Sequence, residues 1–205
     1  MEQKGLLLIS GGVDSPVAGK ILIDQGIKLT AVHFDLQPYT DDAPAKKCVQ
    51  LARQLGINHL TIVPMGPAFA AASHVEHRLY FVLTKRMMIK AASDLAKKEG
   101  IPFLVTGENL GQVSSQTLTN LSVIDAASPI PVIRPLLAYD KEEIIDLSRK
   151  LGLFEVSSGP EVCDVLGPTH PKTRAKIRDV LREEETIMPQ KHIDEALSKA
   201  VVHDF

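Results

Sequence analysis

The chain has 205 residues, 44% of them hydrophobic, and a formal net charge of -2, which suits one globular domain and excludes a general positive field for nucleic acid. Its two cysteines, Cys48 and Cys163, form no CxxC pair, which excludes a disulfide framework and a cysteine-based zinc site. We expect a cytoplasmic protein with no membrane partner, because a reducing compartment suits this cysteine usage and the apolar run 6–9 is too short for a signal peptide or a membrane span.

Short apolar runs alternate with helical patterns along most of the chain. Strands are predicted at 6–9, 29–34, 60–63, 103–106 and 132–133, and helices at 16–25, 43–55, 78–99 and 140–151. A glycine directly follows each of these helices, and Asp140 with Glu143 forms a capping pattern at the start of the last one. Two charged helices, at 174–185 and 192–202, are predicted after a proline-flanked linker.

Apolar strands separated by helices are typical of a parallel sheet that is covered on both faces. We therefore predict an open, doubly wound, Rossmann-like α/β fold in a single domain over residues 1–205. Its core is expected over about 1–165 and a C-terminal helical appendage over about 170–205. Ligands of such folds bind beyond the carboxyl ends of the strands.

The sequence Ser-Gly-Gly-Val-Asp-Ser, residues 10–15, connects the first predicted strand to the first predicted helix. Adjacent glycines let the backbone approach an anion, and the helix start directs N–H groups to the same point. Ser10 and Ser15 can add hydroxyl donors, whereas Asp14 suits this place if it holds a cation or orients groups around a Mg²⁺-bound nucleotide. The loop lacks both the Walker A and the GxGxxG pattern, and a plain turn capped by aspartate is the structural alternative.

Two lysines occupy unusual positions. Lys85 interrupts the apolar pattern of its helix, where a solvated helix face is the ordinary explanation. Lys141 directly follows the cap of its helix, where a positive charge is unfavourable for the helix dipole, so a separate task such as neutralising an anion competes with a plain surface position.

The two cysteines have different surroundings. Cys163 lies in an irregular loop, where partners can reach a thiol, whereas Cys48 has apolar neighbours and is interpreted as packed.

The loop at 10–15 resembles the PP-loop of the N-type ATP pyrophosphatases, which cleave ATP between the α and β phosphates and adenylate a substrate. Further segments of this chain resemble the catalytic domain of ThiI-type tRNA 4-thiouridine synthetases. In chain order they are SGGVDSPVA, AVHF, KRMM, TGENLGQVSSQT, VIRPLLAYDKEEII and PEVC. This resemblance covers nearly the whole chain up to the terminal helices. It implies the adenine nucleotide alpha hydrolase type of fold, with ATP and Mg²⁺ as cofactors.

The resemblance also implies roles for individual residues. The catalytic residues would be Asp14, Lys141 and Cys163, with the cysteine taking part in sulfur transfer, and no residue is assigned as a metal ligand. Nucleotide contacts would come from Leu8, Ile9, Ser10, Gly11, Gly12, Ser15, His33, Phe34, Lys85, Gly107 and Gln116. The alternatives are core packing for His33 and Phe34 and an ordinary turn for 107–116.

The implied reaction is ATP-dependent sulfur transfer to a uridine of tRNA, with release of pyrophosphate. Full-length members of the family carry an N-terminal THUMP region that recruits tRNA, and some carry a C-terminal rhodanese domain. Because this chain begins at the PP-loop strand, we expect tRNA to be recruited by a separate THUMP protein. A persulfide donor such as a cysteine desulfurase and a homodimer are expected by the same resemblance.

Three alternatives stay open, and they concern the RNA surface, the acceptor and catalysis itself. The basic residues Lys172, Arg174, Lys176 and Arg178 form either an RNA contact or a solvated helix face. A stand-alone enzyme could sulfurate or amidate a different substrate, for example in thiamine-related sulfur metabolism. A non-catalytic module that binds ATP or AMP is the third alternative, although such a module needs no thiol.

Overall fold

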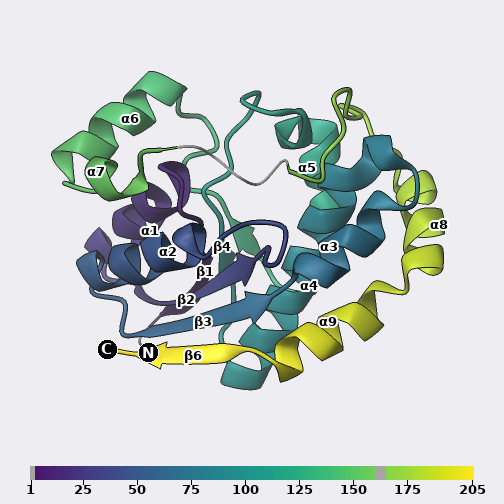
Figure 1. The fold of residues 1–205 in the computed structure, drawn as a ribbon. Coiled ribbons are helices and arrows are strands. Elements are labelled where there is room, and N and C mark those ends of the chain that lie inside the picture. Colours follow the sequence, from purple (N-terminus) through teal and green to yellow (C-terminus); the bar gives the residue numbers. More distant parts are fainter. Residues whose placement is uncertain (1–2, 160–164) are drawn as a thin grey trace.

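The computed structural model describes residues 3–159 and 165–205, which form one sheet with helices on both faces (Figure 1). Its strands are β1 (Lys4–Leu8), β2 (Lys28–Asp35), β3 (His59–Pro64), β4 (Leu104–Val105), β5 (Val132–Ile133) and β6 (Val201–Asp204). They lie in the order β5-β4-β1-β2-β3-β6, and neighbours are parallel except for β3 and β6. This is the predicted doubly wound sheet with one antiparallel edge.

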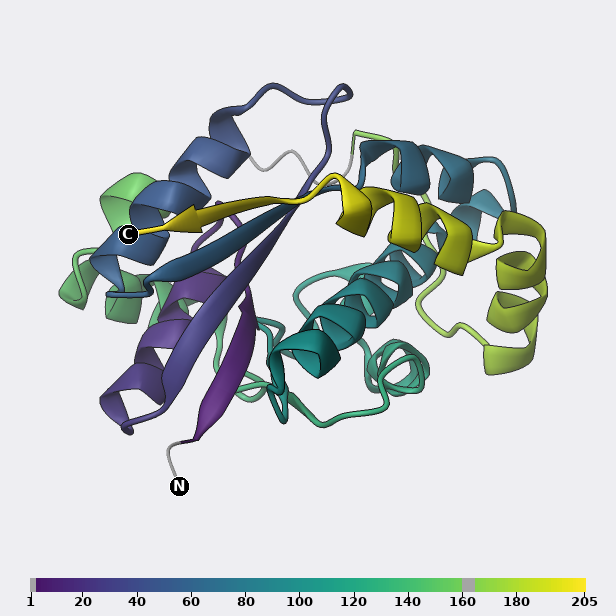
Figure 2. The same ribbon diagram turned by 90° about the horizontal axis from the view of Figure 1, so that it is seen from below.

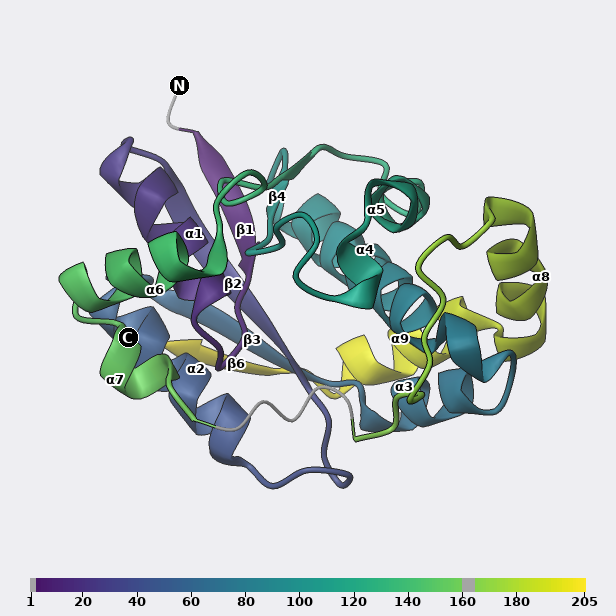
Figure 3. The same ribbon diagram turned by 90° about the horizontal axis from the view of Figure 1, so that it is seen from above.

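Helices cover the two faces unequally. They are α1 (Asp14–Asp24), α2 (Ala43–Gln54), α3 (Gly66–Ser73), α4 (Tyr80–Glu99), α5 (Leu118–Asp125), α6 (Lys141–Lys150), α7 (Phe154–Ser157), α8 (Ile177–Ile187) and α9 (Pro189–Ser198), with short 3-10 turns η1 (His77–Leu79) and η2 (Ser114–Gln116). On one face α1 and α2 pack on the strands, with α6 and α7 outside them, whereas α4 covers the other face with α3, α5 and α9 around it (Figures 1 and 3). Within the described ranges, no helix combines the length and the apolar character that a membrane crossing needs.

Alternate residues of β1 face opposite layers, as the period of a strand requires. Leu6 and Leu8 belong to the core cluster on the α4 side, whereas Leu7 and Ile9 belong to the cluster beneath α1 and α2. After the exposed Lys4, the strand is apolar because both of its faces are buried. Its pattern therefore predicts a central strand, which the sheet order confirms.

The local signals for helix ends are confirmed. The predicted stops Gly26, Gly56, Gly100 and Gly152 all have positive φ angles, and such a left-handed residue ends a helix at little cost only when it is glycine. At the start of α6, Asp140 Oδ1 accepts the Glu143 N–H at 2.8 Å, and Glu143 Oε2 accepts the Asp140 N–H at 2.9 Å. This capping box places Lys141 as the first residue of the helix.

The C-terminal prediction is partly wrong. Instead of a helix over 192–202, α9 ends at Ser198 and the chain continues as β6 along the edge of β3 (Figure 2). Backbone pairing with β3, together with the Arg53 guanidinium 4.7 Å above the Phe205 ring, holds this end against the sheet. Tertiary pairing therefore overrides the local helical pattern. The helix predicted at 174–185 is α8, at Ile177–Ile187, and the sequence pattern does not predict α3, α5 or α7.

The strand order reverses between β1 and β4. From β1 the chain proceeds to β2 and β3 on one side, whereas β4 and β5 lie on its other side. The connections that leave β1 and β4 therefore diverge at their carboxyl ends, which is where open α/β sheets bind their ligands. Residues 9–15 and 106–116 occupy this switch point.

Candidate active site

The loop at 10–15 is held together by its own serine hydroxyls. The Ser10 N–H donates to Ser15 Oγ at 2.8 Å, and the two hydroxyl oxygens lie 3.0 Å apart. The Gly12 N–H donates to Ser10 Oγ at 3.4 Å. After Val13, which caps α1 without a side-chain hydrogen bond, the first turn of the helix points its N–H groups toward the switch point. This geometry is the one that favours anion binding at helix N-termini, and anion binding by this loop stays a prediction.

Gly107 brings the connection after β4 against the start of α1. A Cβ atom at Gly107 would lie 2.5 Å from the Ser15 nitrogen and 2.6 Å from the Asp14 carbonyl carbon. Any larger residue would force the two loops apart, because glycine alone allows so close an approach of two backbones. Gly107 therefore sets the spacing of the switch point, and its direct contact with a nucleotide stays a prediction.

Lys141 joins the loop from the first turn of α6. Its ammonium lies 2.7 Å from Asp14 Oδ1, and both side chains are partly exposed. The lysine at an unfavourable end of α6 thereby balances an aspartate that would repel an anion at the start of α1. The structure brings together these two predicted catalytic residues, which are far apart in the sequence.

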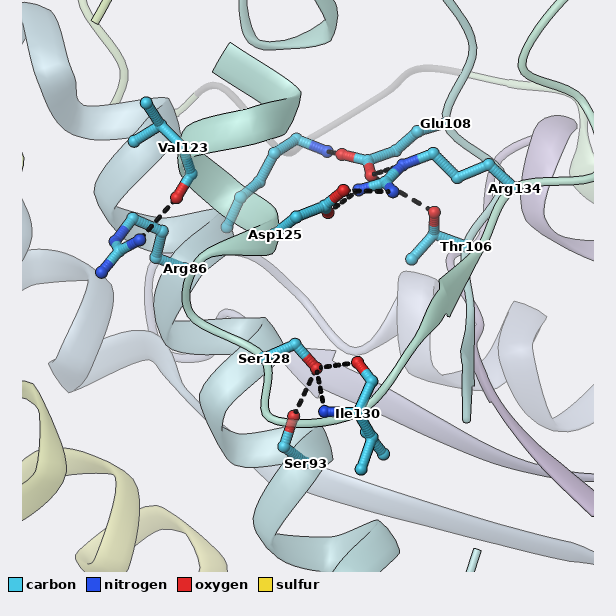
Figure 4. A network of polar contacts seen from close by, with 10 residues as sticks. Arg86, Ser93, Thr106, Glu108, Val123, Asp125, Ser128, Ile130 and Arg134 are labelled. Carbon is cyan, nitrogen blue, oxygen red and sulfur yellow. Dashed lines mark hydrogen bonds and ion pairs between the residues drawn. The ribbon is translucent and has the colours of Figure 1, made fainter. Parts of the chain in front are cut away.

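Lys85 reaches the same edge from α4. Its ammonium lies 2.6 Å from Glu108 Oε1, while Arg134 Nε donates to Glu108 Oε2 at 3.0 Å and the Thr106 hydroxyl donates to the same oxygen at 3.2 Å. The remaining guanidinium nitrogens of Arg134 donate to both carboxylate oxygens of Asp125, at 3.1 and 2.6 Å. Figure 4 shows Arg134 lying between Glu108 and Asp125. We call Lys85, Glu108, Arg134 and Asp125 the edge network.

Charge balance keeps the Glu108 carboxylate ionised although its side chain is only 8% exposed. Burial alone would raise the pKa of Glu108, but Lys85 and Arg134 outweigh this effect and hold the pKa below its usual value. Burial would lower the pKa of Arg134, and here Asp125 and Glu108 outweigh it and raise that pKa. Two cations and two carboxylates thus cancel, so the network adds no net charge to the site.

The segment after Glu108 contains buried polar atoms that lack partners among the described residues. They are Asn109 Oδ1, Gln112 Nε2 and Gln116 Oε1. Other atoms of the segment are satisfied, for example Asn109 Nδ2, which donates to the Tyr139 carbonyl at 2.9 Å. Folded proteins pair nearly all buried polar atoms, so three unpaired ones in one loop favour a polar ligand there over an ordinary turn.

The predicted nucleoside-binding residues have their side chains in the core. Leu8 and Phe34 lie in the cluster beneath α4, and Ile9 lies in the opposite cluster. His33 Nδ1 lies 3.1 Å from the Ile9 carbonyl oxygen and 3.2 Å from Cys48 Sγ, and burial lowers the pKa of His33 and raises that of Cys48. Cys48 is packed, as predicted. Contact of a nucleotide with the backbone at these positions stays a prediction.

Lys47 of α2 links the loop at 10–15 to the chain that leads to Cys163. A Cβ atom at Gly11 would lie 3.3 Å from Lys47 Cδ, and the Lys47 ammonium donates to the Ser158 carbonyl at 2.8 Å. Cys163, the predicted sulfur-transfer residue, lies outside the described residues, so its role stays a prediction. Of the basic residues at 172–178, Lys172 and Arg178 both pair with Asp179 of α8.

Sequence reasoning missed Glu108, Arg134, Asp125 and Lys47. Glu108 could have been found, because it follows Gly107 in the segment that was singled out as a polar loop. Arg134 comes directly after β5, at the carboxyl end of a parallel strand, which is a signal for a ligand-edge residue. Asp125 and Lys47 carry no such signal, since their partners are set by tertiary contacts.

The arrangement suits a polyphosphate next to a polar organic group. The loop at 10–15 offers N–H and hydroxyl donors, Lys141 and Lys85 offer cationic nitrogens at its sides, and the unpaired atoms of 109–116 offer hydrogen-bonding positions. A Mg²⁺ ion fits beside Asp14, because this ion is held by one or two carboxylates together with phosphate oxygens and water. These residues fit a Mg²⁺-bound nucleotide.

Known proteins are similar to this chain in sequence. Residues 1–188 match the family described as Thiamine biosynthesis protein (ThiI). A probable tRNA sulfurtransferase of Coxiella burnetii is 38% identical over 204 residues, and one of Moorella thermoacetica is 38% identical over 201 residues. The matches cover 96% and 95% of this chain but 52% of each relative, so the chain spans about half the length of these relatives.

Solved structures resemble the whole described fold. A crystal structure of a 4-thiouridine synthetase–RNA complex with bound ATP has a TM-score of 0.92 at 31% identity, covering 98% of this chain and 55% of that one. NMN synthetase from Francisella tularensis has a TM-score of 0.61 at 15% identity, covering 95% of this chain and 83% of that one, which is a likeness of fold alone. The predicted fold class is confirmed.

Proposed function

The chain belongs to the ThiI family, and on that premise we propose that it is an ATP-dependent sulfurtransferase that converts a uridine of tRNA to 4-thiouridine. The observation that carries the proposal is the switch point, where the loop at 10–15, Lys141 and the edge network meet. The similar 4-thiouridine synthetase was crystallised with ATP and RNA, which supports both substrates.

ATP would bind with its phosphates on the loop at 10–15. The α1 N–H groups, Ser10 and Ser15 would donate to phosphate oxygens, with Lys141 and Lys85 at the sides. Asp14 would hold Mg²⁺ together with phosphate oxygens, and the ion would neutralise phosphate charge. Gln116, whose buried Oε1 lacks a partner among the described residues, would accept a hydrogen bond from the nucleoside.

Adenylation would come first. The uridine O4 attacks the α-phosphorus while the N3 proton passes to solvent. The bond from that phosphorus to the bridging oxygen breaks, and pyrophosphate leaves with the electron pair. The residues of the loop and Lys141 stabilise the charge that develops on the leaving pyrophosphate. This step makes C4 reactive, because AMP is a far better leaving group than the original carbonyl oxygen.

Sulfur transfer would follow at C4. The terminal sulfur of a persulfide donor attacks C4 and AMP leaves, which forms a disulfide between the donor and C4. The Cys163 thiolate then attacks the donor sulfur, so that the sulfur stays on C4 and Cys163 forms a disulfide with the donor. An external thiol reductant restores Cys163. A cysteine desulfurase would supply the persulfide, and a separate THUMP protein would present the tRNA.

Mass spectrometry of nucleosides tests this function. Purified chain is incubated with ATP, Mg²⁺, tRNA, a persulfide donor and a THUMP protein, and 4-thiouridine is measured. We expect 4-thiouridine with the wild type and none with Cys163→Ser, although Cys163→Ser still binds ATP. Absence of the product with the wild type in every combination would contradict the proposal, and a Cys163→Ser variant with full turnover would remove the thiol from it.

A small-molecule acceptor is the second candidate, because the family description names thiamine biosynthesis. The same adenylation site would then activate a carbonyl other than that of uridine. If tRNA from cells that lack this protein keeps its 4-thiouridine while the cells need thiamine, the small-molecule acceptor is favoured. Loss of 4-thiouridine in those cells favours tRNA.

A further inference from the structure

We propose that Glu108 is a positioning residue that competes with the bound nucleotide for Lys85, so that Lys85 exchanges partners as ATP binds and as pyrophosphate leaves. The inference rests on the proposed use of ATP at this edge. It assigns the edge network a role in release: without a second partner for Lys85, this cation would stay on the leaving phosphates. Arg134 makes the exchange feasible, because it keeps Glu108 paired when Lys85 departs.

The geometry separates the two cations of Glu108 by their freedom to move. Arg134 is 7% exposed, and its guanidinium donates to three carboxylate oxygens, which are Glu108 Oε2 and both oxygens of Asp125. Lys85 is 27% exposed and its ammonium has Glu108 Oε1 as partner at 2.6 Å. Lysine carries its charge on a flexible four-carbon stem, whereas the planar guanidinium is held by its fork geometry. Lys85 is therefore the cation that can leave.

Glu108 lies where an exchange with phosphate is geometrically possible. It directly follows Gly107, where a Cβ atom would lie 2.5 Å from the backbone nitrogen of Ser15 in the phosphate loop. A carboxylate so close to a phosphate repels it unless cations stand beside it. With Lys85 on the phosphate, the pair of Glu108 and Arg134 stays neutral and buried, and no uncompensated buried charge arises.

A second network on α4 has the same construction away from the switch point. Glu184 of α8 pairs with the buried Arg86, 2% exposed, and with the partly exposed Lys90, 25% exposed. Each unit thus combines one buried carboxylate, one buried arginine and one partly exposed lysine. Variants at Glu184 and Lys90 are therefore matched controls, since they disturb an equal ion unit without touching the proposed exchange.

The test is a double-mutant cycle on the full chain with ATP as the probe and equilibrium dialysis as the measurement. We expect Glu108→Gln to bind ATP about fivefold more tightly, because the competing charge-assisted hydrogen bond to Lys85 is gone. In a Lys85→Met background the same Glu108→Gln change should alter the ATP Kd less than about twofold. Pyrophosphate, measured by competition, should follow ATP in both backgrounds, and Glu184→Gln and Lys90→Met should leave both affinities unchanged.

Glu108→Asp serves where Glu108→Gln fails to fold. It keeps a negative charge for Arg134 and withdraws the carboxylate from Lys85, so ATP should again bind more tightly. Equal tightening with and without Lys85 would show plain repulsion and overturn the exchange, as would unchanged or weaker ATP binding in both Glu108 variants. If the wild type binds ATP and the Glu108 variants bind it with the same affinity, only this inference is contradicted. A wild type that binds no ATP contradicts the proposed function as well.

Discussion

Glu108 and Glu184 are two buried carboxylates that lie beside α4, and each meets one buried arginine and one partly exposed lysine. Adjacent residues of the helix serve them: Lys85 points to Glu108 and Arg86 to Glu184. The first unit lies at the switch point beside the loop at 10–15, whereas the second ties α4 to the C-terminal α8. On the proposed function, similar ion units serve a ligand at one place and the fold at another, and their position in the sheet topology decides which.

Replacing Arg86 should give the largest effect on stability. Arg86→Met leaves the buried Glu184 with only Lys90 as a side-chain partner, and it removes the Arg86 donor from the Val123 carbonyl. We therefore expect the free energy of unfolding to fall by about 3 kcal/mol. Urea denaturation measures it. The exposed Arg149→Met variant is the control and should change stability by less than about 0.5 kcal/mol. If folded Arg86→Met bound ATP more weakly than the wild type, this would contradict a purely structural role for the Glu184 unit.

Replacing Lys85 should show the opposite pattern from Arg86. Lys85→Met removes a cation from the proposed phosphate site, so ATP should bind about tenfold more weakly. Its stability should fall by less than about 1 kcal/mol, because Glu108 keeps Arg134. Lys90→Met, equally exposed but away from the switch point, should bind ATP as the wild type does. If Lys85→Met and Lys90→Met bound ATP equally well in equilibrium dialysis, this would contradict a role in ATP binding for the lysine at the switch point.

Acid should weaken both units in the same direction. Burial raises the pKa of Glu184, but Arg86 and Lys90 outweigh burial and lower it, as Lys85 and Arg134 do for Glu108. A carboxyl with a lowered folded-state pKa contributes stability above its unfolded value of about 4.3 and loses it as the pH falls through the folded value. Unfolding free energies measured below about pH 4.3 should therefore fall steeply, and less steeply in Glu184→Gln. Identical slopes would show that Glu184 titrates alike in both states.

The smallest effect is expected at Asp125. Its side chain is 45% exposed, so solvent weakens its pairing with Arg134, and Asp125→Asn should cost less than about 0.5 kcal/mol in urea denaturation. ATP affinity should stay within about twofold of the wild type, because Glu108 still holds Arg134. A larger loss of affinity would mean that Asp125 belongs to the functional part of the edge network.

Local chemistry made much of the fold predictable, and tertiary contacts explain the rest. The glycine stops and the Asp140–Glu143 capping box follow from neighbouring residues alone, and the structure confirms them. Residues 201–204 became a strand because they pair with β3, which no local pattern reveals. The anion site at loop 10–15 is a prediction that the sequence alone makes. Its pairing with Lys141 and its contact with Gly107 needed the sheet to bring distant segments together.

The product of ATP cleavage tests the central claim most directly. Wild-type chain is incubated with ATP, Mg²⁺, tRNA, a persulfide donor and a THUMP protein, and nucleotide products are separated by chromatography. The account predicts AMP and pyrophosphate, with both lost in Asp14→Asn and Lys141→Met and retained in Lys46→Met, which alters an exposed lysine paired with Asp42. ADP and inorganic phosphate, or cleavage that persists without Asp14 and Lys141, would contradict it.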